Sequence, residues 1–424
     1  MPLENWMHKN GDHRNGTSSI LFLALAAAIL AGCTLAKRNP VPRELLDRAD
    51  PPGMADWRFI GEHDEALDRG RMTGRIDVLR SQMSASGLDR RPVNVLAISG
   101  GGSNGAYGAG MLEGWSELGT RPEFNVVTGI STGALTAPFA FLGSEYDERL
   151  ARCYTTFSTR DFVKERGLVQ GLTGDAFGEP SGLRGLLEEQ LDEEAFRRIG
   201  EEHRRGRRLF IGTTNLDRME PVYWCISAIA AEDLPGGRRL ACDIILASAS
   251  IPAVFPPVLI EVVGPDGESY DEMHVDGGVS NQVFTFPVSL KFRGSNVLAD
   301  QDRAPAVWVI RNAPLILRYD ETDRSLLSIA GRAISGLIHS NGIGDLYRIW
   351  LTTRRDGFDF HLASIPFDFD VIPAEPFDPV HMKALFERGR NDMLEGVAWN
   401  DYPPQLGPAD EEALRIEFEG SPRR

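Results

Sequence analysis

One serine between two glycines, at a predicted strand-to-helix junction, constrains the fold of this chain more than any other feature. Gly129-Ile130-Ser131-Thr132-Gly133 follows the β-prone residues 124–127 and precedes residues 134–142, which are apolar and favour a helix. Such a sharp turn strains the serine backbone and brings neighbouring chain close, so small residues are needed two positions away on either side. The following helix points its positive end at Ser131, which favours an alkoxide or a developing oxyanion. The motif therefore predicts a nucleophile on an α/β fold.

A glycine loop precedes this motif. Residues 93–98 are a predicted buried strand that runs directly into Gly100-Gly101-Gly102-Ser103-Asn104-Gly105. Consecutive glycines let backbone N–H groups turn towards one point, where an acyl-transfer intermediate places its negative oxygen. The loop also fits the dinucleotide-binding pattern, which expects an acidic residue at the end of the next strand. Glu123 lies near that distance but precedes its strand, so we interpret the loop as an oxyanion hole.

The candidate base is an aspartate at the end of a predicted β-hairpin. The hairpin consists of residues 258–263, the turn Pro265-Asp266-Gly267 and residues 270–275, and Asp276-Gly277-Gly278 follows it directly. The two glycines allow the chain to turn away, so the carboxylate can project into a cleft. Burial and hydrogen bonds can tune such a carboxylate to accept the proton of a serine.

A Ser-His-Asp triad is the alternative, because an α/β-hydrolase esterase needs an acid and then a histidine after the serine. The candidate histidines are His274, His339, His361 and His381. None of these four has the glycine-flanked strand-end position of Asp276. His274 would share a strand face with Asp276, two residues away, and we expect it to pack or to lie at the surface rather than to assist catalysis.

Taken together, these motifs resemble the patatin-like phospholipase family. The resemblance covers about residues 93–290 and includes the segment Ala247-Ser248-Ala249-Ser250-Ile251-Pro252-Ala253-Val254-Phe255-Pro256-Pro257. It implies a three-layer α/β/α sandwich with a mostly parallel central sheet, and hydrolysis of fatty-acyl esters such as phospholipid or lysophospholipid. It also implies that Ser131 is the nucleophile, that Asp276 is the proton acceptor, and that Gly100, Gly101 and Gly102 bound the oxyanion hole.

Two departures from the family pattern concern substrate preference. The family loop often carries Arg or Lys where this chain has Asn104. The family also often has Asn-x-Pro after the aspartate loop, whereas here Asn281 is followed by Gln282 and Val283. Neither departure removes the serine or the aspartate.

The N-terminus resembles a bacterial lipoprotein signal. Residues 20–30 are an eleven-residue apolar run that ends in Leu30-Ala31-Gly32-Cys33, too short to span a bilayer but suited to a signal-peptide core. The resemblance implies cleavage after residue 32 and lipidation of Cys33. Because Thr34 follows, it also implies a protein of the cell envelope, sorted to the outer membrane and facing the periplasm. A buried core helix or an uncleaved anchor is the alternative.

The remaining chain is divided by composition and hydrophobic pattern. The predicted parts are a signal peptide over residues 1–32, a tether with a peripheral helix over 33–92, a catalytic domain over 93–400 and a tail over 401–424. Within the domain, the pattern predicts strands at 306–311 and 358–364 and helices at 325–353 and 379–399.

Charge and cysteine content exclude several classes of partner. The net charge is −16, so nucleic acid and anionic lipid surfaces would repel the protein, and membrane residence has to come from the lipid anchor. At most one disulfide can form among Cys153, Cys225 and Cys242, and we expect each of them to be buried and unpaired; no spacing suggests a metal site or another cofactor. A non-catalytic lipid-binding envelope lipoprotein is the competing function, and the sequence leaves the oligomeric state open.

Overall fold

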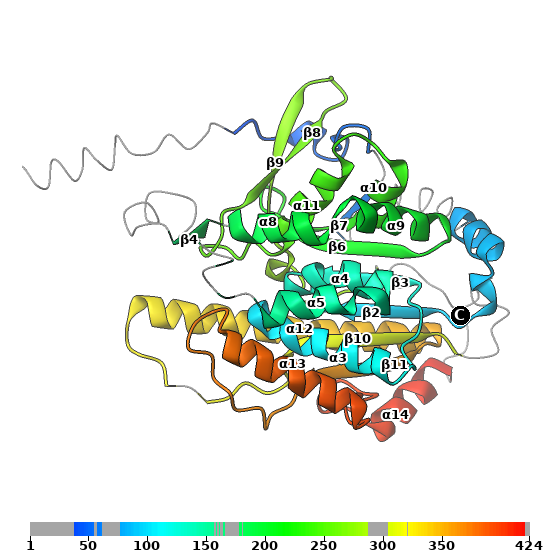
Figure 1. Cartoon of the computed structure of the whole chain (residues 1–424), viewed down its shortest axis with the longest axis vertical. Coiled ribbons are helices and arrows are strands. Elements are labelled where there is room, and N and C mark those ends of the chain that lie inside the picture. Colours follow the sequence, from blue (N-terminus) through cyan, green and yellow to red (C-terminus); the bar gives the residue numbers. More distant parts are fainter. Residues whose placement is uncertain are drawn as a thin grey trace, which may run out of the picture.

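A buried, mostly parallel β-sheet runs through the middle of the structure (Figure 1). The computed structural model describes residues 38–54, 57–61, 77–156, 158, 161, 164–165, 178–179, 181–286, 304–319 and 321–419. In this part of the chain the main strands follow the order β1-β7-β6-β3-β2-β10-β11, and the hairpin β8-β9 joins at β6. The bounds are β1 (Arg58–Ile60), β2 (Asn94–Ile98), β3 (Val126–Ile130), β6 (Arg208–Asn215), β7 (Glu220–Cys225), β8 (Val258–Val263), β9 (Ser269–Asp276), β10 (Ala306–Pro314) and β11 (Asp359–Ile365). The short strands β4 (Lys164–Glu165) and β5 (Gly178–Glu179) form a separate pair.

The central strands β6, β3, β2, β10 and β11 are parallel, whereas β1, β7, β8 and β9 join by antiparallel pairing. Parallel strands are buried on both faces, which explains why residues 95–98 are apolar without alternation. Alternate residues of β2 enter different cores: Leu96 and Ile98 pack in one cluster, and Val95 and Ala97 in the other.

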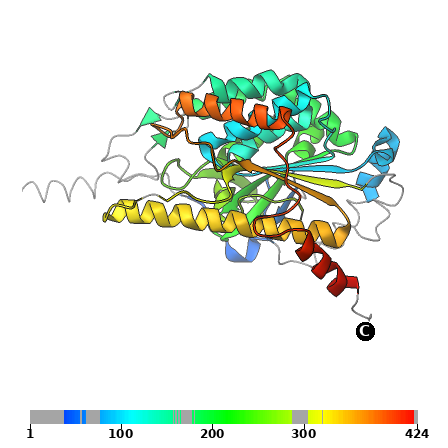
Figure 2. The same cartoon turned by 90° about the horizontal axis from the view of Figure 1, so that it is seen from below.

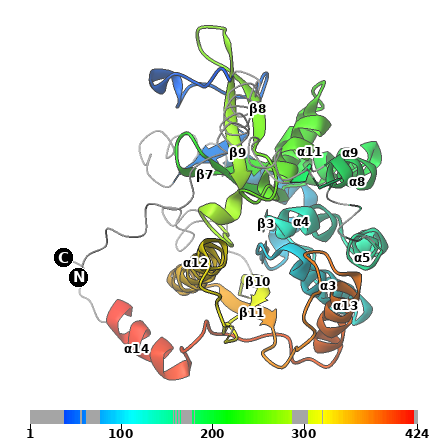
Figure 3. The same cartoon turned by 90° about the vertical axis from the view of Figure 1, so that its left-hand side faces the viewer.

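Helices cover both faces of the sheet, as the view along its edge shows (Figure 3). One face carries α3 (Gly105–Glu117), α4 (Thr132–Leu142), α5 (Asp147–Thr155) and α13 (Pro379–Leu394), and the other carries the long α12 (Leu326–Asp356) (Figure 2). Further helices are α8 (Ser181–Gln190), α9 (Glu193–Arg204), α10 (Ile226–Glu232), α11 (Gly237–Ser248) and α14 (Pro408–Glu419), and residues 77–86 are also helical. The predicted three-layer α/β/α architecture is confirmed.

Residues 38–54, within the predicted tether, lie on the β8-β9 hairpin. Arg38 donates through Nε to Asp271 at 2.7 Å, and the backbones of Asp50 and Val263 exchange hydrogen bonds. Strand β1 pairs with β7, and Arg58 from β1 forms a buried ion pair with Glu272 of β9 at 2.5 Å. This segment of the predicted tether is therefore part of the folded body.

The predicted elements of the domain agree with the structure in type. Strands β10 and β11, helix α12 and the hairpin β8-β9 lie where the pattern placed them. The closing helix α13 ends at Leu394, earlier than predicted, where Gly396 adopts a left-handed φ of +73° that stops a helix. None of the helices in the described ranges is long and apolar enough to cross a bilayer. Cys33, the predicted signal peptide and residues 420–424 lie outside the described residues.

Candidate active site

Ser131 occupies the sharp turn between β3 and α4. Its backbone has φ +56° and ψ −123°, a conformation that strains any residue with a side chain. A Cβ atom on Gly129 would lie 2.3 Å from the carbonyl oxygen of Gly133, and a Cβ on Gly133 would lie 2.3 Å from that of Ile98. Close backbone packing therefore requires both glycines of the motif. The turn places Ser131 at the start of α4, where it is 6% exposed.

Asp276 ends β9 and lies beside Ser131. The Ser131 side chain lies close enough to the Asp276 carboxylate to lower its pKa, and the Gly278 N–H donates to Oδ1 at 2.7 Å. Burial nevertheless raises the pKa of Asp276 to about 6. A Cβ on Gly277 would lie 2.4 Å from the carbonyl oxygen of Gly212, so the chain can turn here only with glycine. The carboxylate is thus mostly ionised at neutral pH but more basic than an exposed aspartate, which suits a general base.

The glycine loop lies next to the serine and keeps two donors free. The Gly100 N–H donates to the carbonyl oxygen of Gln282 at 3.1 Å. Within the described residues, the N–H groups of Gly101 and Gly102 have no acceptor. A Cβ on Gly101 would lie 2.3 Å from the carbonyl oxygen of Asn312, and Gly102 has a φ of +58°. The loop conformation therefore depends on glycine and leaves two donors that can stabilise an oxyanion.

Asn104 and Ser103, the other members of the loop, form the short 3-10 turn over Gly102–Asn104 that leads into α3 at Gly105. The Asn104 side chain contacts His381 Nε2 on α13 at 3.0 Å. It thus joins the loop to α13, at the position where the family often has a cation.

The Ser131 turn has supports that sequence reasoning did not single out. The Ser131 N–H donates to Ser248 Oγ at 2.9 Å, and Ser248 donates to the carbonyl oxygen of Gly212 at 2.6 Å. Tyr154 from α5 contacts the hydroxyl of Thr132 at 2.5 Å. Ser248 belongs to the segment that carried the family resemblance, which is the one signal that pointed to it. No local pattern marks Tyr154.

The four candidate histidines have other partners. In the part of the chain that the structure describes, none of them hydrogen-bonds to Ser131 or Asp276. The partners are Glu272 and Thr213 for His274, Arg311 for His339, Asp401 for His361, and Asn104 and Val371 for His381. Burial lowers the pKa of His274, so this fully buried ring is neutral and packs inside β9, as expected. The triad arrangement is not assembled.

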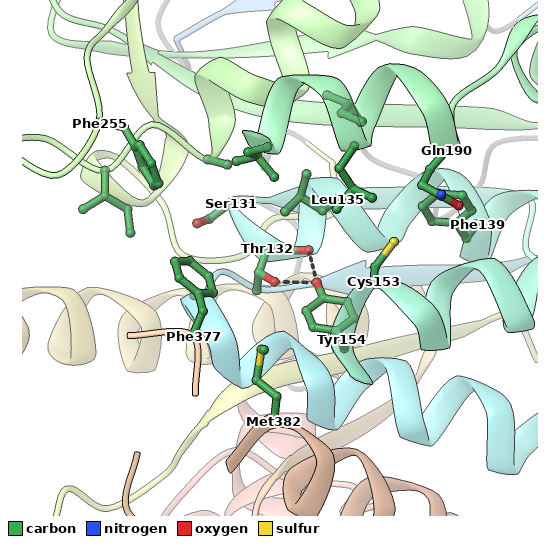
Figure 4. A pocket seen from close by; sticks show the side chains of 16 residues that line it. Ser131, Thr132, Leu135, Phe139, Cys153, Tyr154, Gln190, Phe255, Phe377 and Met382 are labelled. Atoms are coloured by element: carbon green, nitrogen blue, oxygen red, sulfur yellow. Dashed lines mark hydrogen bonds between the residues drawn. The ribbon is translucent and has the colours of Figure 1, made fainter. Parts of the chain in front are cut away.

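An apolar pocket opens beside Ser131 (Figure 4). The volume in it that is open to a water-sized molecule is about 60 Å³. The lining residues come from the glycine loop, from α4, α5, α8 and α13, and from loops near them: Gly102, Ser131, Thr132, Leu135, Phe139, Cys153, Tyr154, Leu183, Leu186, Leu187, Gln190, Ala249, Ile251, Phe255, Phe377 and Met382. A pocket of this composition suits the hydrocarbon part of a lipid.

The described residues hold no cluster of three or more His, Cys, Asp or Glu side chains that could bind a metal ion. Cys153, Cys225 and Cys242 are free thiols, as expected. Burial raises the pKa of Cys153 to about 12, so this thiol is protonated at neutral pH.

Residues 96–288 match the family model of the patatin-like phospholipase. Similar solved structures include VipD from Legionella pneumophila, with 12% identity, 74% of this chain and 68% of that chain covered, and a TM-score of 0.37. For the human GIVD cytosolic phospholipase A2, the identity is 12%, the match covers 66% of this chain and 51% of that chain, and the TM-score is 0.27. The type III effector ExoU from Pseudomonas aeruginosa has 12% identity, 78% and 60% coverage and a TM-score of 0.30. The chain thus spans about half to two thirds of the length of these structures. No curated protein has significant sequence similarity to it.

Proposed function

Since residues 96–288 of this chain form a patatin-like phospholipase domain, a lipid acyl hydrolase domain, we propose that it cleaves fatty-acyl esters through a dyad of Ser131 and Asp276. The observation that carries the proposal is the position of the buried Asp276 carboxylate beside the Ser131 side chain, close enough for this hydroxyl to lower the pKa of the carboxylate. A serine is a weak nucleophile until a neighbouring base takes its proton. Asp276 lies in that position, and no histidine within the described residues does.

In the acylation step, Asp276 accepts the hydroxyl proton of Ser131 as Oγ attacks the carbonyl carbon of the ester. The carbonyl π bond breaks and its electron pair moves to the oxygen, which becomes the oxyanion. The free N–H groups of Gly101 and Gly102 would stabilise this charge, each by an amount on the order of 3 kcal/mol. The tetrahedral intermediate then collapses, and the alcohol leaves with the proton that Asp276 held.

In the deacylation step, Asp276 takes a proton from water, and the resulting hydroxide attacks the acyl-enzyme carbonyl. Ser131 leaves as the fatty acid forms, and the proton on Asp276 returns to the serine oxygen. One carboxylate therefore serves both half-reactions, which requires that it be ionised in the free enzyme and in the acyl-enzyme and protonated in each tetrahedral intermediate. A pKa of about 6 for Asp276 fits both requirements near neutral pH.

The pocket supports a lipid as the substrate. Leucine, phenylalanine, methionine, isoleucine and alanine side chains make up most of its wall, and no Lys or Arg is among the residues that line it. Such a surface binds a hydrocarbon chain and leaves the headgroup outside. The proposed substrates are therefore phospholipid, lysophospholipid or a related fatty-acyl ester.

The proposed location is the cell envelope, with the protein attached to the outer membrane through lipid on Cys33. The support comes from the sequence: an apolar run too short to span a bilayer precedes Leu30-Ala31-Gly32-Cys33, and the net charge of −16 opposes electrostatic binding to anionic lipid. One acyl chain binds membranes only weakly, whereas two or more hold a protein firmly.

The dyad is tested by Ser131→Ala and Asp276→Asn, assayed against short-chain esters and against mixed lipid vesicles with identification of the released products. Each variant should lose at least about a thousandfold in kcat/KM, because residues that act as a unit are each indispensable. Residual activity above about a tenth of the wild type in either variant would refute the dyad.

Single alanine substitutions of the four candidate histidines are the controls. Each should keep activity within about tenfold of the wild type when corrected for folded protein. A loss of about a thousandfold in one of them would favour the triad esterase instead. A fluorophosphonate probe should label Ser131 alone, and a native protein that neither reacts with the probe nor hydrolyses any ester would be a lipid-binding scaffold.

A further inference from the structure

The pocket beside Ser131 is a channel that runs along one face of α4. Ser131, Leu135 and Phe139 all line it, and they are four residues apart, so they lie in a row on the helix surface. The facing wall comes from α8, whose lining residues Leu183 and Gln190 lie seven positions apart with two further leucines between them. Figure 4 shows Phe139 and Gln190 together at one end of the row, away from Ser131.

The helix geometry sets the length of this channel. Eight residues separate Ser131 from Phe139, and at about 1.5 Å per residue they span about 12 Å. An extended chain of single bonds advances about 3.3–3.6 Å for every three bonds, or about 1.2 Å per bond. The distance from the nucleophile to Phe139 therefore corresponds to about ten bonds of extended hydrocarbon.

The far end of the channel is narrowed by buried side chains. Phe139 is 3% exposed and Gln190 is 5% exposed. The Gln190 amide contacts Glu189 at 3.3 Å, and its backbone carbonyl accepts from Arg149. A hydrocarbon chain that reached this point would be blocked by the buried Phe139 ring and would meet the polar amide of Gln190, with which it cannot form a hydrogen bond. Among the described residues, the apolar wall thus ends where Phe139 and Gln190 meet.

We propose that this channel is the acyl site and that Phe139 and Gln190 limit the preferred acyl group to about eight to ten carbons. The inference rests on the proposed function, because it takes Ser131 as the atom that holds the acyl group. Each methylene buried contributes about 0.8 kcal/mol, a factor of about four in kcat/KM. Activity should therefore rise with chain length until the channel is full and fall for longer chains.

The wild-type profile is measured with p-nitrophenyl esters of 4 to 16 carbons, diluted to one fixed mole fraction in neutral detergent micelles. We expect kcat/KM to be highest at about eight to ten carbons and about tenfold lower at sixteen. A profile that stays level or rises to sixteen carbons would overturn the inference. If no ester of any length were hydrolysed, the proposed function itself would be wrong, so the two failures are distinct.

Two substitutions should move the optimum in opposite directions. Phe139→Ala lengthens the channel and should raise the ratio of sixteen-carbon to ten-carbon activity by about tenfold. Leu135→Trp fills the channel about 6 Å from Ser131, so the optimum should fall to about four to six carbons. Phe139→Leu and Leu135→Phe are milder versions for use if either protein folds poorly.

Phe141→Ala is the matched control. Phe141 is a fully buried phenylalanine on the same helix, but it does not line the channel. Instead, the centre of its ring lies 4.4 Å from the guanidinium carbon Cζ of Arg207. Its loss should weaken the fold without moving the chain-length optimum. If Phe139→Ala and Phe141→Ala had the same profile, Phe139 would have no part in selecting the chain, and the proposal would fail.

Cys153 offers a readout that does not depend on turnover, because among the described cysteines its thiol lines the channel, whereas Cys225 and Cys242 are buried elsewhere. In a Ser131→Ala background at pH 9, where more of this thiol is ionised than at neutral pH, ten-carbon fatty acid should slow alkylation of Cys153 by an apolar iodoacetamide at least about fivefold. Equal labelling with and without the fatty acid would overturn the assignment of the channel as the acyl site.

Discussion

Asp276→Asn should stabilise the fold at neutral pH while it abolishes hydrolysis. Asp276 is 5% exposed, and its Oδ1 accepts from the Gly278 N–H at 2.7 Å. Asparagine can keep that acceptor through its amide oxygen, so the substitution retains the shape of the site and the hydrogen bond from Gly278. What it removes is the buried negative charge.

The magnitude follows from the pKa of Asp276. Burial raises this pKa from 3.8 to about 6, although Ser131 and the Gly278 N–H lower it. At about 1.36 kcal/mol per pH unit, this rise corresponds to about 3 kcal/mol of folding free energy. Because the folded state holds this proton more tightly than the unfolded state, the stabilisation is complete below about pH 4 and is lost as the pH rises through about 6. The advantage of the asparagine variant should therefore grow from almost nothing at pH 4 to about 3 kcal/mol at pH 8.

Glu272→Gln, four residues earlier on β9, is the control with the opposite sign. Burial would raise the pKa of Glu272, but Arg58 and His274 lower it to about 2. A carboxylate with a lowered pKa stabilises the fold above its unfolded pKa, and this contribution is lost as the pH falls through about 2. Removing the charge takes from Arg58 its buried partner and leaves only the ion pair with the more exposed Asp50, which should lower the free energy of unfolding by about 3 kcal/mol at pH 7 and by less in acid.

Urea unfolding at pH 4, 5, 6, 7 and 8, with the slopes compared to confirm that the unfolded states are equivalent, measures both variants. Two results would refute the reasoning about Asp276. The first is an asparagine variant that is less stable than the wild type at pH 8. The second is a stability difference that does not change with pH.

Three further outcomes are expected. The kcat/KM for a neutral ester should fall about tenfold per pH unit below about pH 6, because Asp276 must be ionised to act as a base; a flat profile down to pH 4.5 would exclude it. Gly133→Ala should lower the free energy of unfolding by at least about 1–3 kcal/mol, since its Cβ would lie 2.3 Å from the carbonyl oxygen of Ile98. Gly185→Ala, where a Cβ would meet no atom within 4 Å inside α8, should raise the free energy of unfolding by about 0.5–1 kcal/mol, and thermal unfolding measures both variants. Cys33→Ser should release a soluble, active enzyme on fractionation, and retention in a salt-washed membrane pellet would refute the lipid anchor.

The features that could be predicted from sequence are those whose causes are local. The glycines around Ser131 are required by backbone contacts within a few residues or with the adjacent strand, so the pentapeptide alone indicates the turn. Gly277 is similarly required where the chain leaves β9. The apolar runs of the central strands indicate a parallel sheet because both faces are covered.

The features that could not be predicted depend on residues far apart in the chain. Ser248 accepts a hydrogen bond from the Ser131 N–H although the two residues are 117 positions apart in the sequence, and Arg58 pairs with Glu272, which is 214 positions away. A lone serine or arginine has no pattern that specifies its partner, and the prolines between residues 40 and 52 resemble loop chain whether or not they pack. The extent of the channel was equally hidden, because its walls come from α4, α5, α8 and α13 together.

The contacts of Arg38 with the β8-β9 hairpin limit the distance between the folded domain and the membrane surface if Cys33 carries lipid. Arg38 is fixed by contacts with Asp217 and Asp271, so five peptide units at most join the folded body to the proposed anchor. At about 3.6 Å per residue they reach no farther than about 18 Å, less than the thickness of the hydrocarbon core of a bilayer. Such a short linker would hold the enzyme at a high effective concentration of lipid in its own membrane. It would also keep the enzyme from any bilayer farther away than the length of the linker. Hydrolysis would then occur in cis, on the leaflet that holds the enzyme, and its rate would depend on lateral diffusion of lipid in the plane rather than on encounters in solution.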